Sequence, residues 1–111
     1  MKKNRKILLK GIGASPGIVK GMVQVIHQPV EATRMKEGKI LVVPFTNPLF
    51  TLALLKCSAL ITDEGGIMSH GAIIARELGI PAVVGTKRAT SVLKNGQIVL
   101  VDGAGGEVYE E

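Results

Sequence analysis

Three short apolar runs in the middle of the chain constrain its fold more than any other feature. They cover residues 39–44, 59–62 and 82–84. Short apolar runs bounded by turn residues are typical of strands that are buried on both faces. Helices are expected between them. Asn47 followed by Pro48 predicts an N-cap and a first helical turn, with the helix running to about Lys56.

The two ends of the chain are richer in strand patterns than the middle. We expect strands over residues 7–9, 18–26 and 97–101, with a last strand beginning at Val108, and a short helix over 88–93. Glycine-rich residues 11–17 and 103–106 are predicted turns, and residues 28–38 are polar and irregular. This order predicts one layered α/β domain over residues 1–111, with parallel and antiparallel strand pairing and a disordered segment at residues 1–6.

Composition excludes several classes of function. Aromatic residues make up 3% of the chain, too few for a platform that stacks single-stranded nucleic acid. Five basic residues in the first ten positions indicate a solvated basic terminus, although salt-sensitive nucleic-acid binding by this segment stays an alternative: Lys2, Lys3, Arg5, Lys6 and Lys10. No run has the length of a signal peptide or a membrane span, so we expect a cytoplasmic protein.

One cysteine and one of the two histidines are best interpreted as structural. Cys57 excludes an intramolecular disulfide and any metal site built from several cysteines, and its apolar neighbours indicate a core position in a reducing compartment. His27 ends a predicted strand beside Gln28 and Pro29, which favours a surface position.

The other histidine lies where a helix is predicted to begin. Ser69 is a plausible N-cap, and the helix should run to Leu78 and end at Gly79. The first turn of a helix offers unpaired N–H groups and a partial positive charge, which stabilise anions and phosphate above all. His70 is therefore the candidate acceptor of a phosphoryl group, whose charge the backbone N–H groups from Ser69 to Ala72 would neutralise.

Residues around this histidine suit the same chemistry. Gly65 and Gly66 carry no side chain that could block a phosphate or a partner's active site, and the Ser69 hydroxyl could cap the helix or bind the phosphate. Asp63 and Glu64 could bind Mg²⁺, orient the imidazole or only solvate the loop; two carboxylates do not decide between these.

The arginine of the predicted helix is less directly placed. Arg76 lies nearly two turns beyond the histidine, so a structural ion pair with Glu77, Asp63 or Glu64 is favoured over contact with the phosphate. No metal is expected on this chain.

The segment from Gly65 to Glu77 resembles the phosphohistidine signature of the phosphoenolpyruvate-utilising enzymes, a family that includes phosphoenolpyruvate synthase, pyruvate phosphate dikinase, enzyme I and rifampin phosphotransferase. Two flanking segments, 13–17 and 79–85, and the closing segment 101–109 are also similar to this family in the expected order. The family usually has Thr where this chain has Met68, which has no hydroxyl, and often Ala where it has Gly71.

The resemblance implies a swivelling β/β/α phosphohistidine domain, in which Gly71 belongs to the loop that supports the phosphate. In such enzymes an ATP-grasp domain and a phosphoenolpyruvate/pyruvate-binding domain lie at the two ends of the transfer, and Mg²⁺ is expected at those partner sites. Transfer of phosphate through His70, by the imidazole nitrogen remote from the backbone, is the first hypothesis. The second, which Met68 favours, is a non-catalytic regulatory or interaction module that retains the fold.

Overall fold

The computed structural model describes residues 4–111 and contains eight strands and five short helices within them. The strands are β1 (Ile7–Lys10), β2 (Ile12–Ser15), β3 (Ile18–Val25), β4 (Ile40–Val43), β5 (Ala59–Thr62), β6 (Ala82–Val84), β7 (Ile98–Asp102) and β8 (Glu107–Glu110). The α-helices are α1 (Thr51–Lys56), α2 (His70–Leu78) and α3 (Ala89–Val92), and two 3₁₀ helices are η1 (Pro29–Arg34) and η2 (Pro48–Phe50).

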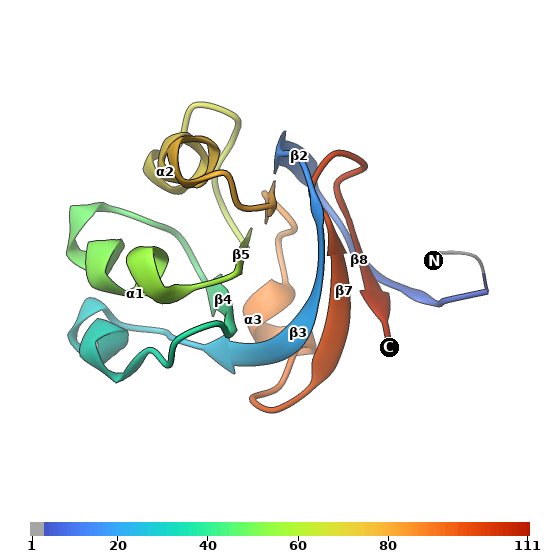
Figure 1. The fold of residues 1–111 in the computed structure, drawn as a ribbon, viewed down its shortest axis with the longest axis horizontal. Coiled ribbons are helices and arrows are strands. Elements are labelled where there is room, and N and C mark those ends of the chain that lie inside the picture. Colours follow the sequence, from blue (N-terminus) through green and yellow to red (C-terminus); the bar gives the residue numbers. More distant parts are fainter. Residues whose placement is uncertain (1–3) are drawn as a thin grey trace.

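The eight strands form one mixed sheet in the order β1-β8-β7-β3-β4-β5-β6-β2. Strands β3 to β6 pair in parallel and the remaining pairs are antiparallel. β3 is long and curved, and it pairs with β7 through its first half and with β4 through its second (Figure 1). β1 and β2 end the strand order on opposite sides but follow one another in the chain, so the segment through Gly11 closes the sheet on itself.

Alternate residues of the parallel strands face two different hydrophobic cores. In β4, Ile40 and Val42 belong to an inner core enclosed by the sheet, whereas Leu41 and Val43 belong to an outer core. This arrangement explains why the central strands are apolar throughout, since neither face meets water. Ala89 of helix α3 and Leu93, which directly follows the helix, belong to the inner core.

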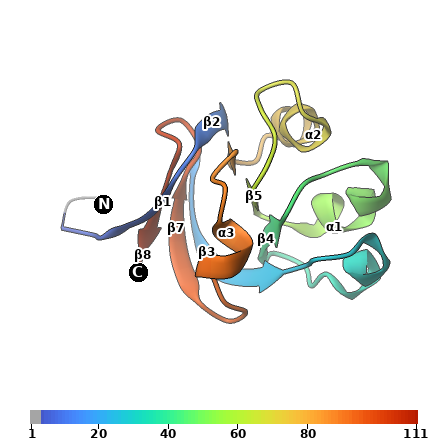
Figure 2. The same cartoon turned by 180° about the vertical axis from the view of Figure 1, so that it is seen from behind.

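Helices cover the outer core on one side of the molecule. α1 and α2 lie on the outside of the parallel half of the sheet, while β1, β7 and β8 form the opposite wall (Figures 1 and 2). Fully buried helical residues fill this layer, among them Phe50, Leu54, Ala72 and Ala75. The result is a sheet, sheet and helix layering, and the expected α/β class with parallel and antiparallel pairing is confirmed.

Most predicted elements are confirmed, but the turn predicted over residues 11–17 is wrong. Residues Ile12–Ser15 form strand β2, which pairs with β6. A Cβ on Gly13 would lie 2.4 Å from the Gly103 carbonyl oxygen. The glycine therefore serves a close approach of two backbones within a strand, and not the tight turn that the composition favoured.

The polar segment 28–38 is also more regular than predicted. It contains η1, which begins at Pro29. The Glu31 carboxylate accepts hydrogen bonds from the Gln28 and His27 N–H groups at 2.9 and 3.0 Å and so secures the start of this helix. These two donors lower the pKa of Glu31.

The expectation of disorder over residues 1–6 falls partly outside the described residues, which begin at Asn4. Among those described, the Lys6 carbonyl accepts a hydrogen bond from the Glu110 N–H at 2.8 Å. Within residues 4–111 no helix has both the length and the apolar character needed to cross a membrane.

Candidate functional site

Helix α2 begins and ends where its capping residues predict. The Ser69 hydroxyl accepts the Ala72 N–H at 3.4 Å, and Gly79 ends the helix in the left-handed conformation, with φ of 73°. His70 is consequently the first residue of the helix.

The two ring nitrogens of His70 have different environments. Nδ1 is buried and has no hydrogen-bond partner among the described residues. Nε2 makes no hydrogen bond to any residue of 4–111 and is not among the buried atoms that lack a partner, so it has surface exposed to solvent. The accessible nitrogen is the one remote from the backbone, and it is the only ring nitrogen that an incoming group could reach in this conformation.

The N–H groups around His70 are largely occupied, which differs from the direct supply of donors that we expected. Ser69 N–H donates to the Gly66 carbonyl at 3.0 Å, and Gly71 N–H donates to the Thr46 hydroxyl at 2.8 Å. Ala72 N–H is taken by Ser69, as described. Two of these backbone N–H groups therefore donate to hydroxyl groups, those of Thr46 and Ser69.

The glycines of this region have distinct roles. Gly65 has a φ of 123°, a conformation that L-residues rarely adopt, and a Cβ there would lie 3.3 Å from Ser69. Gly71 leaves room for Thr46, because its Cβ would lie 2.7 Å from the threonine Oγ1 and 2.8 Å from Leu60. A Cβ on Gly66 would meet nothing within 4 Å, so the described residues give no packing reason for that glycine.

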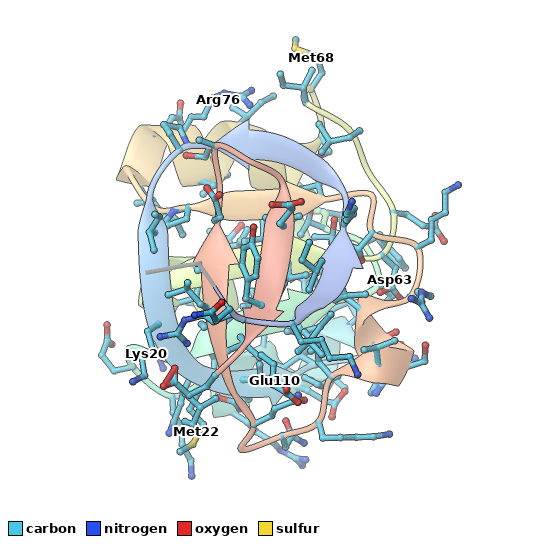
Figure 3. All side chains as sticks on the ribbon, turned by 90° about the vertical axis from the view of Figure 1, so that its right-hand side faces the viewer. Lys20, Met22, Asp63, Met68, Arg76 and Glu110 are labelled. Carbon is cyan, nitrogen blue, oxygen red and sulfur yellow. The ribbon has the colours of Figure 1, made fainter. Side chains whose placement is uncertain are left out.

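Two apolar side chains project from the loop before the helix. Ile67 is 55% exposed and Met68 is 76% exposed. Met68 lies at the outer end of the molecule, above helix α2 (Figure 3). It contributes no hydroxyl to the site, and its thioether projects away from the core.

The two carboxylates before the glycines, Asp63 and Glu64, do not form a cluster with His70. Asp63 accepts hydrogen bonds from the Thr90 N–H at 2.8 Å and from the Thr90 hydroxyl at 2.5 Å, so it caps helix α3. Glu64 is exposed, and its carbonyl accepts the Thr62 hydroxyl at 2.7 Å. The described residues contain no group of three or more potential histidine, cysteine or carboxylate metal ligands.

Arg76 holds the loop and the sheet to helix α2. Its guanidinium donates to the Ala14 carbonyl at 2.8 Å and to the Ile67 carbonyl at 2.7 Å. These contacts replace the ion pair that we expected with a neighbouring carboxylate. They fix the loop immediately before His70, so Arg76 supports the geometry of the site through the backbone of this loop.

Sequence reasoning missed Thr46, Thr62 and Thr90. Thr46 lies in the loop after β4, and Thr62 is the last residue of β5. Thr90 belongs to α3 and binds Asp63 in the loop after β5. The carboxyl ends of parallel strands share one edge of a sheet, where ligands bind in open α/β folds. Thr46 lies three residues after the end of β4, and this position was the signal that could have identified it.

Cys57 is a core residue, as expected. It is 8% exposed in the outer core, and its Sγ donates to the Leu54 carbonyl at 3.3 Å. Burial raises the pKa of the Cys57 thiol to about 12, so it is not a thiolate near neutral pH.

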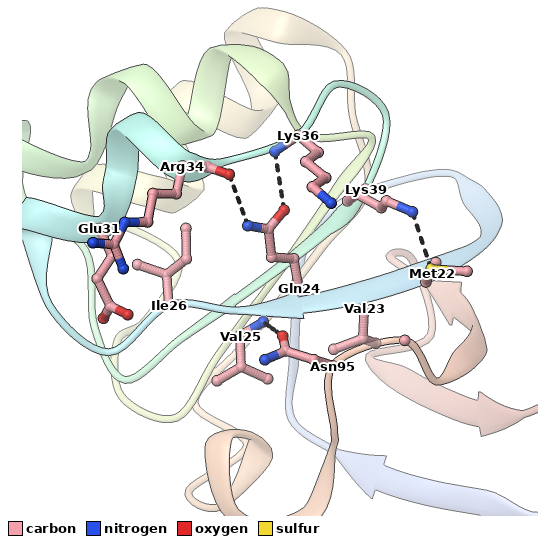
Figure 4. A pocket seen from close by; sticks show the side chains of 11 residues that line it. Met22, Val23, Gln24, Val25, Ile26, Glu31, Arg34, Lys36, Lys39 and Asn95 are labelled. Carbon is pink, nitrogen blue, oxygen red and sulfur yellow. Dashed lines mark hydrogen bonds between the residues drawn. The ribbon is translucent and has the colours of Figure 1, made fainter.

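A hollow of about 480 Å³ lies away from the histidine. Met22, Gln24, Arg34, Lys36 and Lys39 line it, together with Asn95 (Figure 4). Met22 and Met68 lie at opposite ends of the molecule in Figure 3. The Gln24 amide is already bound to the Arg34 carbonyl and the Lys36 N–H. This hollow is separate from the site around His70.

Comparison with known proteins gives a consistent result. Residues 35–106 match the family described as PEP-utilising enzyme, mobile domain. The chain is 56% identical over 105 residues to a probable phosphoenolpyruvate synthase of Archaeoglobus fulgidus, and this match covers 95% of the chain and 14% of the relative. It is 54% identical over 105 residues to phosphoenolpyruvate synthase of Pyrococcus furiosus, covering 95% of the chain and 13% of the relative.

Solved structures include one of Enzyme I with a TM-score of 0.60 and 38% sequence identity, which matches 69% of this chain and 32% of that one. The chain spans about one seventh of the length of the curated relatives it matches.

Proposed function

The chain belongs to the family of PEP-utilising enzyme mobile domains, and we propose from this that it is a phosphoryl carrier in which His70 is the transient acceptor. It receives phosphate at one site and delivers it at another, on partner domains or subunits. The partners are an ATP-grasp nucleotide site and a phosphoenolpyruvate/pyruvate or other acceptor site, where Mg²⁺ is bound.

The accessible Nε2 of His70 is the observation that carries this proposal. For Nε2 to act as a nucleophile its lone pair must be free, and the ring proton then resides on the buried Nδ1. The Nε2 lone pair forms a bond to phosphorus while the bond from phosphorus to the leaving oxygen breaks. The electron pair of that bond departs with the leaving group, and the reverse step unloads the carrier.

The surroundings of His70 support both halves of this cycle. The start of α2 favours the negative charge of a phosphoryl group. Gly66, four residues before the histidine, has open space where a side chain would lie, which suits the approach of a partner's active site. Arg76 and Asp63 hold the loop and the neighbouring helix through contacts of their own, so these two charged side chains serve the structure of the site.

The proposal is tested by intact-mass analysis of the chain after incubation with ATP or phosphoenolpyruvate, Mg²⁺ and a cell extract that phosphorylates a known carrier. We expect a phosphate adduct that is labile to acid and stable to alkali, because phosphoramidates have this chemistry. His27→Gln should retain the adduct and His70→Ala should lose it. The donor that works identifies the partner site that loads the histidine.

A non-catalytic module is the second candidate, because Met68 is exposed and supplies no hydroxyl to the site. The same assay separates the two candidates. Faster loading of Met68→Thr would indicate a carrier that this residue weakens. Absence of an adduct from both forms, in an extract that phosphorylates the known carrier, would contradict the carrier proposal.

A further inference from the structure

Thr46 contacts helix α2 although it lies far from this helix in the sequence. It lies in the loop between β4 and η2, and its Oγ1 accepts the Gly71 N–H at 2.8 Å across 25 positions of sequence. Gly71 directly follows His70. The hydroxyl is thus fixed within the first turn of α2, beside the residue that carries the phosphoryl group.

The fit between Thr46 and Gly71 is tight. An ideal Cβ at position 71 would lie 2.7 Å from Oγ1 and 2.8 Å from Cγ2 of Thr46. Thr46 therefore occupies the space that a side chain after the histidine would need. Glycine at position 71 is what allows the hydroxyl to reach the helix end.

The proton of this hydroxyl is uncommitted. A threonine hydroxyl has one donor and can accept two hydrogen bonds. Thr46 uses an acceptor position for Gly71, and the described residues supply no acceptor for its own proton. An N–H that donates into a hydroxyl polarises it, which strengthens the hydrogen bond that the hydroxyl can give to an anion.

Few other hydroxyls are available at this end of the helix. Ser69 accepts the Ala72 N–H at the longer distance of 3.4 Å, and Met68 has no polar hydrogen. The Thr51 hydroxyl, at the start of α1, donates to the Pro48 carbonyl at 2.7 Å and does not belong to this set. Thr46 is the better fixed of the two hydroxyls that remain.

We propose that Thr46 is a phosphoryl-binding residue, whose hydroxyl donates a hydrogen bond to the phosphoryl group on His70. Through this hydrogen bond the partial positive charge at the start of α2 stabilises the phosphoryl group. The inference rests on the proposed function. A donor that binds the phosphoryl oxygens stabilises their doubly charged form and lowers the pKa of that group.

The test compares Thr46→Val, which keeps the shape and removes the hydroxyl, with Thr46→Ser, which keeps the hydroxyl. Thr51→Val is the matched control for loss of a threonine hydroxyl outside the site. All variants carry His27→Gln, so that His70 is the only histidine. Should Thr46→Val be unfolded, Thr46→Ala replaces it.

Potassium phosphoramidate loads the histidine without a partner protein. The donor nitrogen is protonated in neutral solution. The Nε2 lone pair binds phosphorus while the P–N bond of the donor breaks, and the electron pair of that bond leaves with the protonated nitrogen as ammonia. The pKa of the protein-bound phosphoryl group is then read from a ³¹P NMR titration, and the loading rate is measured with the donor and extract that phosphorylate the wild type.

We expect Thr46→Val to raise the phosphoryl pKa and to lower the loading rate roughly tenfold, the effect of one charge-assisted hydrogen bond. Thr46→Ser and Thr51→Val should resemble the wild type in both. An unchanged phosphoryl pKa in Thr46→Val overturns the inference, even if its melting temperature falls, because a packing role alone would leave that pKa in place. A wild type that accepts no phosphate from either source overturns the proposed function and this inference with it.

Discussion

At the scale of single residues, the site depends on Gly71, which has no side chain and so leaves room for the Thr46 hydroxyl. Gly71 would be an unfavourable choice in a helix by propensity alone, since alanine is better by about 1 kcal/mol. The contact with Thr46 and Leu60 reverses this preference, because there is no room for a Cβ. Packing, and not helix propensity, decides the residue after the histidine.

We expect Gly71→Ala to destabilise the fold by about 1–2 kcal/mol, because overpacking costs about 1–3 kcal/mol and the gain in helix propensity offsets only part of it. Gly66→Ala is the matched control, since a Cβ there meets nothing and its stability should change by less than about 0.5 kcal/mol. Urea unfolding measures both. Equal stability of Gly71→Ala and the wild type would show that Thr46 and Leu60 can move aside at no cost.

At the scale of elements, the loop from β5 to α2 is held by its neighbours more than by itself. Asp63 joins it to helix α3 through Thr90, and Arg76 joins it to β2. Lys87 N–H adds a bond to the Asp63 carbonyl at 2.7 Å. The loop that presents His70 is therefore part of the packed structure at its two ends, while its middle, at Gly66 to Met68, faces outward.

Asp63→Ala should lower the free energy of unfolding by about 1–2 kcal/mol, the usual cost of losing a helix cap. Asp63→Asn should cost less, because the amide oxygen can still accept the Thr90 N–H. The neighbouring carboxylate serves as control: Glu64→Ala removes an exposed side chain and should have little effect. Urea unfolding of the three variants checks this, and a loss as large in Glu64→Ala would contradict the capping role of Asp63.

At the scale of the whole molecule, the closed sheet brings the two described ends of the chain together. β1 pairs with β8, and Glu111 is bound by Arg5 at 2.7 Å and by Lys20 at 2.9 Å. Arg5 precedes β1 and Lys20 belongs to β3, so these contacts connect Glu111 to the segment before the first strand and to the long curved strand. Helix α2 and the loop before it lie on the opposite side of the molecule (Figure 1).

The pKa of the Glu111 side chain is lowered from its ordinary 4.5 by hydrogen bonds from Arg5 and Lys20. A depressed pKa in the folded state means that this contribution to stability is present above pH 4.5 and is lost as the pH falls through the folded value. NMR titration of the Glu111 carboxyl should give a midpoint below 4.5 that rises in Arg5→Gln and in Lys20→Gln. High salt should also raise it, since the pair is exposed. Identical midpoints in all three proteins would show that the ion pairs are not populated in solution.

Local signals identified much of the fold. The apolar runs predicted β4, β5 and β6, and Ser69 and Gly79 predicted both ends of α2. These features depend on residues within a few positions of one another, through capping and burial. The strand at 12–15 was missed because its glycine content reflects a close approach to the loop after β7, which no local pattern encodes.

The sequence by itself determined that a histidine begins a helix beside two glycines, and that the chain is a layered α/β domain of this family. Only the tertiary structure decided what surrounds the histidine. Thr46 reaches Gly71 and Asp63 binds Thr90 because β4 and β5, which precede them, end at the same edge of the sheet. Arg76 binds Ala14 because β2 pairs with β6 and lies against helix α2. A side-chain hydrogen bond depends on where the folded backbone places its partner, and the folding of the closed sheet sets that position.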